Sequence, residues 1–251
     1  MIPVMSNLQS LAALRRVGVV VPPANPAAEP ELAALLPDSV SMHVSRLPVL
    51  PGDLKARVAQ YGENYAAAIA GFGTLKLEAV FIAMTGASYP LGVAGDRALA
   101  AQLSHAAGAP VWTASLAIFD ALAALGAKRI ALVSPYSPWL TELAVSYWTS
   151  AGLTLTQVVQ VSEDFRAYEL AADEIKAAIA KVKTAAVDAV VLSGTGMLSL
   201  PAILECRGAV GIPLLSSNLC GAWRLLSALG LPASDALTKA APQLAKFLSR
   251  S

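Results

Sequence analysis

Short runs of branched apolar residues alternate along the chain with longer stretches in which alanine and leucine recur at helical spacing. We predict strands at residues 17–21, 39–47, 79–84, 111–112, 129–133, 154–161, 189–192 and 213–215. Helices are predicted between them, at 29–36, 53–72, 95–107, 115–125, 138–151, 169–184, 200–210 and 221–229, with a last short helix after Pro232. Strands that are joined by helical crossovers indicate an α/β fold with mostly parallel sheets.

The pattern also contains an internal repeat. Residues 79–86, AVFIAMTG, align with residues 189–196, AVVLSGTG, at an offset of 110 (189 − 79), and both segments end in Thr-Gly. Residues 16–22 and 129–135 match in the same order. We therefore predict two Rossmann-like α/β lobes related by a pseudo-twofold axis, with each sheet flanked by helices and the active site in the cleft between the lobes. The expected lobes are 15–112 plus 216–251, and 113–215.

Ligands of parallel sheets bind beyond the carboxyl ends of the strands, which brings four loops to one site, at 22–25, 85–88, 135–137 and 194–196. Two of these loops carry a Thr-Gly step between a strand and a helix. Exposed backbone N–H groups, a hydroxyl and a helix N-terminus can hold an anion. Such residues are also common in ordinary strand-to-helix turns, but their symmetric placement favours a role in binding.

Other residues of these loops carry useful groups. Tyr136 follows a predicted strand end, from which its phenol can donate to a carboxylate. Asn25 can bind the same ligand or cap a helix, and Asn218 can bind the ligand or act as an N-cap. We assign catalytic roles to Tyr136, Thr85 and Thr195. The expected substrate-binding residues are Pro23, Asn25, Met84, Gly86, Ser88, Gly194, Gly196 and Asn218.

Composition narrows the classes of function. The chain has 251 residues, of which 56% are hydrophobic and 14% charged, and its formal net charge is +1. No charge excess favours nucleic-acid binding. The mean hydropathy of +0.59 is high, but no apolar stretch approaches the ~20 residues of a membrane span. The hydrophobicity is largely alanine in predicted helices, which is compatible with a homo-oligomer.

The reactive side chains are few. Cys206, Cys220, His43 and His105 have neither zinc-ligand spacing nor the pattern of a disulfide framework, so we expect no metal. The turns lack the GxGxxG and GxxxxGK[ST] patterns of nucleotide sites, and no cofactor is expected. The first ten residues lack the pattern of a secretory signal, which favours a cytoplasmic protein.

Taken together, these features resemble the aspartate/glutamate racemase superfamily. The resemblance rests on the paired lobes, the Pro135-Tyr136 step and the segment LSGTGMLSLPAI at 192–203. Within the superfamily the chain is most similar to arylmalonate decarboxylases and maleate cis–trans isomerases. The first similarity is carried by VPPA at 21–24, and the second by Asn25 with Glu29, His43 with Arg46, and Ser216-Ser217-Asn218 with Trp223.

The resemblance implies cofactor-independent chemistry, in which one or two cysteine thiols at equivalent strand ends transfer a proton or add to a double bond. These positions fall on Met84 and on Gly194, or on Thr195 after a one-residue shift, and Cys206 and Cys220 fit neither. The chain therefore lacks both family cysteines. The carboxylate and oxyanion donors of the family correspond to Thr85, Tyr136 and the amides around Gly86, Thr195 and Gly196.

We therefore expect a cofactor-independent lyase or isomerase that acts on a small carboxylic or dicarboxylic acid. The reaction would be decarboxylation or isomerisation, through an enediolate or carbanion held in an oxyanion site. Decarboxylation can begin without a base, because loss of CO₂ itself generates the carbanion. The alternatives are a non-catalytic protein that binds small carboxylates, and a hydratase or hydrolase on the same scaffold. The expected partner is a small carboxylate, with no nucleic acid and no membrane.

Overall fold

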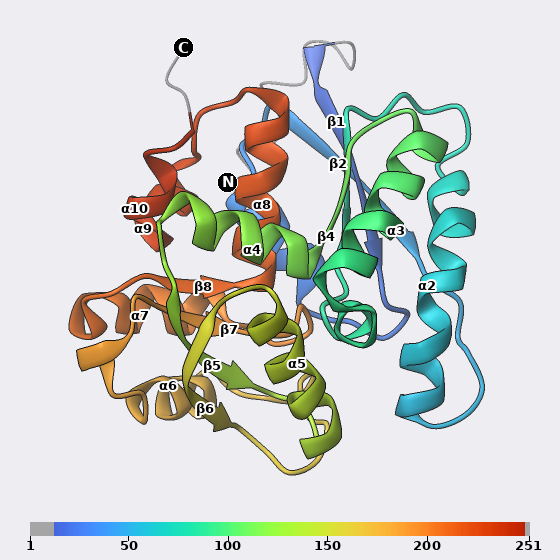
Figure 1. The fold of residues 1–251 in the computed structure, drawn as a ribbon. Helices are drawn as coiled ribbons and strands as arrows, with labels where there is room; N and C mark the ends of the chain where they lie inside the picture. Colours follow the sequence, from blue (N-terminus) through green and yellow to red (C-terminus); the bar gives the residue numbers. More distant parts are fainter. Residues whose placement is uncertain (1–12, 249–251) are drawn as a thin grey trace.

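The protein has an α/β fold with two four-stranded parallel sheets, as the sequence predicts (Figure 1). The computed structural model describes residues 13–248. The first sheet has the order β2-β1-β3-β4 and the second the order β6-β5-β7-β8. The strands are β1 (Arg15–Val21), β2 (Val40–Arg46), β3 (Ala79–Ile82), β4 (Val111–Thr113), β5 (Arg129–Ser134), β6 (Thr154–Gln160), β7 (Ala189–Leu192) and β8 (Leu214–Ser216).

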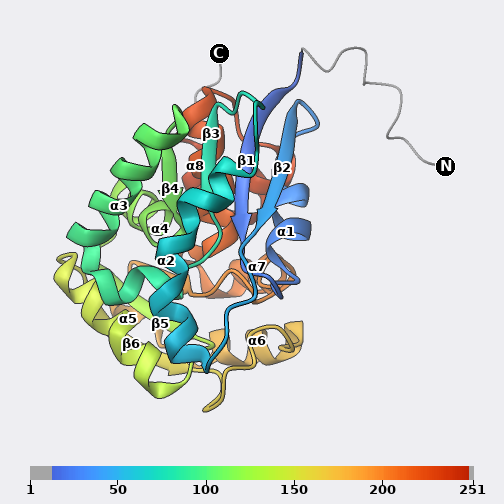
Figure 2. The same cartoon turned by 90° about the vertical axis from the view of Figure 1, so that its right-hand side faces the viewer.

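Helices flank both sheets. In Figure 1 the first sheet lies between α2 and α3 on one side and α8 on the other, and Figure 2 shows the same layers from the side. The α-helices are α1 (Ala28–Leu35), α2 (Leu54–Ala70), α3 (Gly92–Ala107), α4 (Ala114–Ala124), α5 (Pro138–Ser150), α6 (Ala172–Ala180), α7 (Leu200–Val210), α8 (Ser217–Leu229), α9 (Asp235–Ala240) and α10 (Pro242–Ala245). Two 3₁₀ turns complete the set, η3 (Gly86–Leu91) and η4 (Thr184–Ala186).

The two sheets repeat each other down to single hydrogen bonds. Just after β3, the Ala83 N–H donates to the carbonyl of Val20 at 2.8 Å, and just after β7 the Ser193 N–H donates to the carbonyl of Val133 at 3.0 Å. These residues are equivalent in the sequence repeat. Each sheet therefore delivers a Thr-Gly turn at the same end of its third strand.

Helix α8 connects the two halves of the molecule. It follows the last strand of the second sheet but packs against α1, α4 and β3, which come from the N-terminal half. A Cβ at Gly221 would lie 2.4 Å from the ring of Phe81, so glycine is what allows α8 to approach β3 this closely. Helix α4 falls in the predicted second lobe, whereas α1 and β3 fall in the first, so the lobe boundaries stay a prediction.

We expect Gly221→Ala to lower the free energy of unfolding by about 1–3 kcal/mol, the usual cost of overpacking a core. The Phe81 ring is buried on β3, and three of its atoms would lie within 2.7 Å of the new Cβ. Urea denaturation measures the change. Gly208→Ala is the control, because position 208 lies in α7 with no atom within 4 Å of a new Cβ. An equal loss in both variants would contradict the close-approach explanation.

The largest differences between the expected and observed elements are in three helical segments. Helix α8 begins at Ser217 rather than at 221, because the Ser216 hydroxyl accepts from the Leu219 N–H and caps it. The helix predicted at 169–184 is shortened to α6, whose start is fixed by the Glu174 carboxylate accepting from the Ala171 N–H at 3.0 Å. The segment after Pro232 forms two short helices instead of one. Among helices within 13–248, none is long and apolar enough to cross a membrane.

Candidate active site

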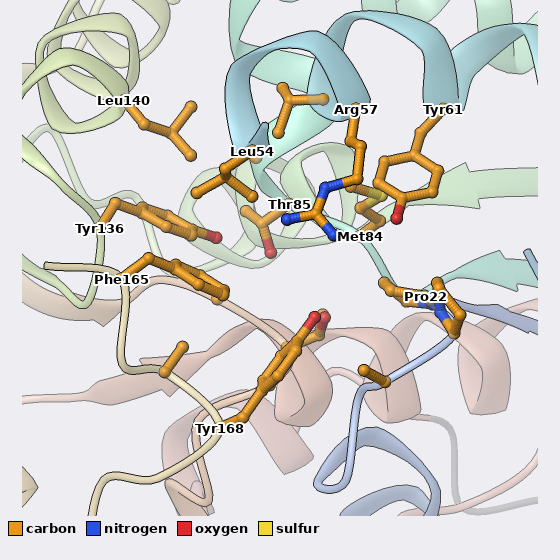
Figure 3. Close-up of a pocket in the computed structure, with 18 residues that line it drawn as sticks. Pro22, Leu54, Arg57, Tyr61, Met84, Thr85, Tyr136, Leu140, Phe165 and Tyr168 are labelled. Carbon is orange, nitrogen blue, oxygen red and sulfur yellow. The ribbon is translucent and has the colours of Figure 1, made fainter. Parts of the chain in front are cut away.

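A small cavity lies between the two halves of the molecule, beyond the carboxyl ends of β1, β3, β5 and β7 (Figure 3). It encloses about 110 Å³, well below the roughly 300–1,000 Å³ of pockets for drug-sized ligands, and therefore suits a small molecule. The lining residues are Pro22, Pro23, Ala24, Leu54, Arg57, Val58, Tyr61, Met84, Thr85, Gly86, Tyr136, Leu140, Phe165, Ala167, Tyr168, Gly194, Thr195 and Gly196.

The two Thr-Gly turns supply free backbone donors to this cavity. Within residues 13–248, no hydrogen bond occupies the backbone N–H groups of Gly86, Thr195 and Gly196. The amide of Gly194 is already used, because it donates to the Ser217 hydroxyl at 3.1 Å. Unpaired amide donors that converge on one cavity can hold a carboxylate or a developing oxyanion.

The phenol of Tyr136 lies between the two turns. A Cβ on Gly194 would be 3.2 Å from its hydroxyl oxygen, and one on Gly86 would be 3.8 Å away. The ring stacks on Phe165 with a centroid distance of 6.1 Å and an interplanar angle of 4°. Burial raises the pKa of Tyr136 well above its usual value, although hydrogen bonds to Ser193 and Thr85 partly offset that rise. The phenol therefore stays protonated and can donate a hydrogen bond.

Two pairs of buried hydroxyls lie beside Tyr136. Thr85 Oγ1 lies 2.9 Å from Ser217 Oγ, and Tyr89 Oη lies 2.5 Å from Ser193 Oγ. Thr85 and Ser193 are the two residues that lower the pKa of Tyr136 against the effect of burial. Both pairs connect a residue of the N-terminal half to one of the C-terminal half. The cavity donors are thus positioned by contacts between the two halves.

The hydroxyl of Thr195 also forms hydrogen bonds within the protein. It donates to the carbonyl of Ala83 at 2.6 Å and accepts from the Asn25 amide at 3.0 Å. Its proton is therefore engaged at the end of β3. The backbone N–H of Thr195 is the group that remains for a ligand.

Three of the predicted binding residues do not line the cavity. The Asn25 side chain accepts from the N–H groups of Ala27 and Ala28 at 3.0 Å, so its helix-capping role is present. The Asn218 amide donates to Glu31 at 2.7 Å and to the carbonyl of Thr195 at 2.9 Å. Asn218 lies inside α8, so its expected N-cap role is wrong. Both asparagines contact Thr195 and support its turn from behind.

Ser88 is the third predicted binding residue that does not line the cavity, and it donates a hydrogen bond to a buried carboxylate. Its hydroxyl donates to Asp96 at 3.0 Å, as do Thr113 at 2.8 Å and Tyr147 at 2.7 Å. The remaining predicted residues all line the cavity, and they are Pro23, Met84, Thr85, Gly86, Tyr136, Gly194, Thr195 and Gly196. Burial raises the pKa of Asp96, an effect that the three hydroxyl donors oppose.

The raised pKa of Asp96 gives a pH-dependent prediction. A carboxyl whose pKa is higher in the folded state stabilises the fold at low pH, and this contribution is lost as pH rises through the folded pKa. The unfolding free energy of the wild type should therefore fall relative to that of Asp96→Asn as the pH rises above the ordinary aspartate pKa of about 4. Urea denaturation across this range measures the difference. Parallel curves for the two proteins would contradict the prediction.

Among the lining residues that the sequence did not predict, four have charged or aromatic side chains. Arg57 and Tyr61 come from α2, and Phe165 and Tyr168 come from the connection between β6 and α6. One signal was available for Arg57, because α2 begins with Lys55 and Arg57 where the helix dipole favours acidic residues. The aromatic pair follows no strand end directly, and its sequence carries no comparable signal.

Neither cysteine lies at the cavity. Cys220 is fully buried within α8, and burial alone raises the pKa of its thiol. Cys206 lies in α7, and burial also raises the pKa of its thiol. The two strand-end positions hold Met84, which lines the cavity, and Gly194, which has a φ of +97°. The described lining residues include no carboxylate, imidazole or thiol, and residues 13–248 contain no cluster of potential metal ligands.

Comparison with known proteins agrees with this architecture. The family model described as arylmalonate decarboxylase matches residues 17–242. Maleate isomerase of Nocardia farcinica is 31% identical over 235 residues, which cover 87% of this chain and 92% of that protein. The crystal structure of the maleate isomerase Iso from Pseudomonas putida S16 has a TM-score of 0.83 at 26% identity, covering 92% of this chain and 99% of that chain.

A similarity to arylmalonate decarboxylase itself is also present. The enzyme of Bordetella bronchiseptica is 29% identical over 156 residues, which cover 55% of this chain and 60% of that protein. The family match spans nearly all of the described fold, including both Thr-Gly turns and Tyr136. The chain therefore belongs to the arylmalonate decarboxylase and maleate isomerase family of the aspartate/glutamate racemase superfamily.

Proposed function

We propose that the protein is a cofactor-independent enzyme that acts on a small carboxylic or dicarboxylic acid, by decarboxylation or isomerisation through an enediolate. The observation that carries this proposal is the pair of Thr-Gly turns, whose free amides and the Tyr136 phenol converge on one small cavity. Both family activities act on small carboxylic acids, which is the class of ligand that such donors suit.

The donors supply catalysis through the charge that develops on the substrate. As a carbanion forms next to a carboxylate, negative charge moves onto the carboxylate oxygens. Fixed N–H and O–H donors stabilise this enediolate more strongly than the starting acid. Each well-placed donor of this kind contributes roughly 3–4 kcal/mol to the transition state.

Decarboxylation is the route that this set of side chains supports best. The electrons of the breaking C–C bond stay on the substrate carbon, CO₂ leaves, and no base is required. A proton must then be delivered to that carbon, either by the protonated phenol of Tyr136 or by water. Isomerisation of a double bond needs a group that adds to it and leaves again, and the described lining residues offer no thiol for that step.

One relative bears on whether a thiol is needed for binding. The maleate isomerase of Pseudomonas putida S16 was solved with maleate in a variant that has alanine in place of a cysteine. That protein therefore holds the diacid without this sulfur atom. The same reasoning supports ligand binding here, where Met84 and Gly194 occupy the two strand-end positions.

Proton NMR in D₂O tests the proposal with purified protein and a panel of small acids. The panel contains phenylmalonate, methylmalonate, maleate, fumarate, aspartate and glutamate. One spectrum per acid reports loss of CO₂, isomerisation, hydration and deuterium exchange together. We expect turnover of at least one malonate, with deuterium at the carbon that lost CO₂. The absence of all four changes for every acid would contradict an enzymatic role on this class.

A second candidate is a non-catalytic protein that binds small carboxylates. It is favoured by one observation, namely that no carboxylate, imidazole or thiol is among the described lining residues. Saturation-transfer NMR on the same samples separates the two functions. A binder gives transfer signals from an acid whose spectrum never changes with time.

A further inference from the structure

Arg57 brings a positive charge into the cavity. Among the described residues that line it, Arg57 alone carries a charge. Figure 3 shows its guanidinium pointing from α2 into the cavity, toward the region of Thr85 and Met84. The cavity therefore has a net positive charge that none of its lining residues neutralises.

Several other arginines of the described chain form ion pairs with acids, whereas Arg57 forms none. Arg15, Arg46, Arg129 and Arg224 form ion pairs with Glu78, Glu29, Asp188 and Asp120. Within residues 13–248, no carboxylate lies within 4.0 Å of the Arg57 guanidinium. Its Nε donates to the carbonyl of Asp53 at 3.3 Å, which anchors the group and leaves both terminal nitrogens free of partners in this part of the chain. A half-buried guanidinium with unused donors suits an anionic ligand.

The position of Arg57 in the helix leads to the same conclusion. It lies near the N-terminus of α2, where no acidic residue occupies the first turn. The helix dipole disfavours a cation there in the free protein. A bound anion would interact favourably with the dipole and with the guanidinium together. Asp53, which caps the helix, already accepts from the Ala56 N–H at 2.8 Å.

Two phenols also face this side of the cavity. Tyr61 and Tyr168 line it together with Arg57. Burial raises the pKa of both, that of Tyr168 to about 12, and the charge of Arg57 opposes the rise in each case. Both phenols therefore stay protonated and act as neutral neighbours that do not compete with a ligand for the guanidinium.

We propose that Arg57 is a substrate-binding residue whose guanidinium pairs with one carboxylate of the ligand. This inference rests on the proposed function for the chemical class of the ligand. The Thr-Gly turns bind one carboxylate through their amides, and Arg57 binds the other. A diacid engages both sets of donors, whereas a monoacid engages one, so Arg57 sets the preference for diacids. The planar guanidinium can hold a carboxylate through two parallel hydrogen bonds, which a lysine cannot reproduce.

Isothermal titration calorimetry of the full chain with succinate and butyrate tests the proposal. These probes are a saturated diacid and a monoacid of equal chain length, and neither has a double bond or a malonate carbon. We expect Arg57→Gln to weaken succinate binding by about tenfold or more, and to remove most of the preference over butyrate. Arg57→Lys keeps the charge and should lie between the two proteins.

Lys55→Gln is the matched control. Lys55 lies two residues before Arg57 in the same helix and does not line the cavity, and its ammonium is 6.0 Å from the centroid of the Trp139 ring. Its replacement removes the same charge from the same end of α2. We expect succinate binding by Lys55→Gln to equal that of the wild type. Thermal unfolding of each variant verifies that it is folded.

The possible results separate this inference from the proposed function. Unchanged succinate binding in Arg57→Gln, or an equal loss in Lys55→Gln, would overturn the role of Arg57 and leave the proposed enzyme intact. Binding that depends on Arg57, without turnover of any acid in the NMR panel, would support the ion pair and remove the catalytic proposal. Failure of the wild type to bind either acid would contradict both.

Discussion

Replacement of Tyr136 by phenylalanine should lower the turnover of the acid identified by NMR by about 100-fold or more, the usual effect of removing one oxyanion donor. The Tyr136 phenol lies between the two Thr-Gly turns, and burial keeps it protonated. Phenylalanine preserves the ring that stacks on Phe165, so the shape of the cavity is retained. Initial rates measured by NMR or by CO₂ release give the effect. Because the donor acts on developing charge, kcat should fall more than KM rises.

Tyr147→Phe is the control for this experiment. It also removes a buried phenolic hydroxyl, but that hydroxyl donates to Asp96 at 2.7 Å and lies outside the cavity. Stability should fall in Tyr147→Phe while the rate of the folded protein is kept. Unchanged kinetics in Tyr136→Phe would remove Tyr136 from the proposed site, and equal rate losses in both variants would indicate a general structural effect.

The fold was predictable because its strands and helices follow from the local spacing of apolar residues. Buried strands such as 79–82 and 189–192 are short, branched and apolar, and the matched segments follow in the same order in both halves of the chain. Repetition of one α/β unit then predicts that the two sheets share one topology, as the matching strand orders show. The first residues of the helices were harder to predict. Each start depends on one polar residue, such as Ser216 or Glu174, among other polar residues that could do the same.

The site was predictable where it is formed by strand ends. Residues that directly follow β3, β5 and β7 reach the cavity because parallel strands deliver their carboxyl ends to one place. Thr85, Tyr136 and Gly196 were found in this way. The position of a residue after a strand does not predict on which side of the turn its side chain lies. Asn25 and Asn218 were therefore expected in the cavity, whereas their amides lie behind the Thr195 turn.

The groups that enter from a helix or a long connection were not predictable in this way. Arg57 reaches the cavity only because α2 crosses its opening, which depends on how α2 packs on β1 and β2. Phe165 is placed by stacking on Tyr136, and Tyr168 by packing on Gly196, where a Cβ would lie 2.2 Å from its ring. Such contacts depend on tertiary packing, which the spacing of residues along the sequence does not predict.

The structure around position 194 suits glycine in particular, and not merely any residue without a thiol. Gly194 has a φ of +97°, a region that residues with a Cβ rarely adopt. A Cβ there would also lie 3.0 Å from Pro135 and 3.2 Å from the Tyr136 hydroxyl. The present backbone and the position of Tyr136 therefore both require glycine. Met84 lines the cavity as Gly194 does, but it is not among the residues with positive φ.

Gly194→Cys should lower the free energy of unfolding by about 2–4 kcal/mol, from backbone strain together with steric overlap. For a domain of this size such a loss lowers Tm by roughly 5–15 °C. We also expect no gain in turnover, because the new side chain displaces the Tyr136 phenol on which the proposed chemistry depends. Gly152→Ala isolates the backbone contribution, since Gly152 has a φ of +80° but no atom within 4 Å of a new Cβ. A Gly194→Cys variant that keeps its Tm and gains decarboxylase activity would show that the turn relaxes to accept a thiol, and that the glycine is not structurally required.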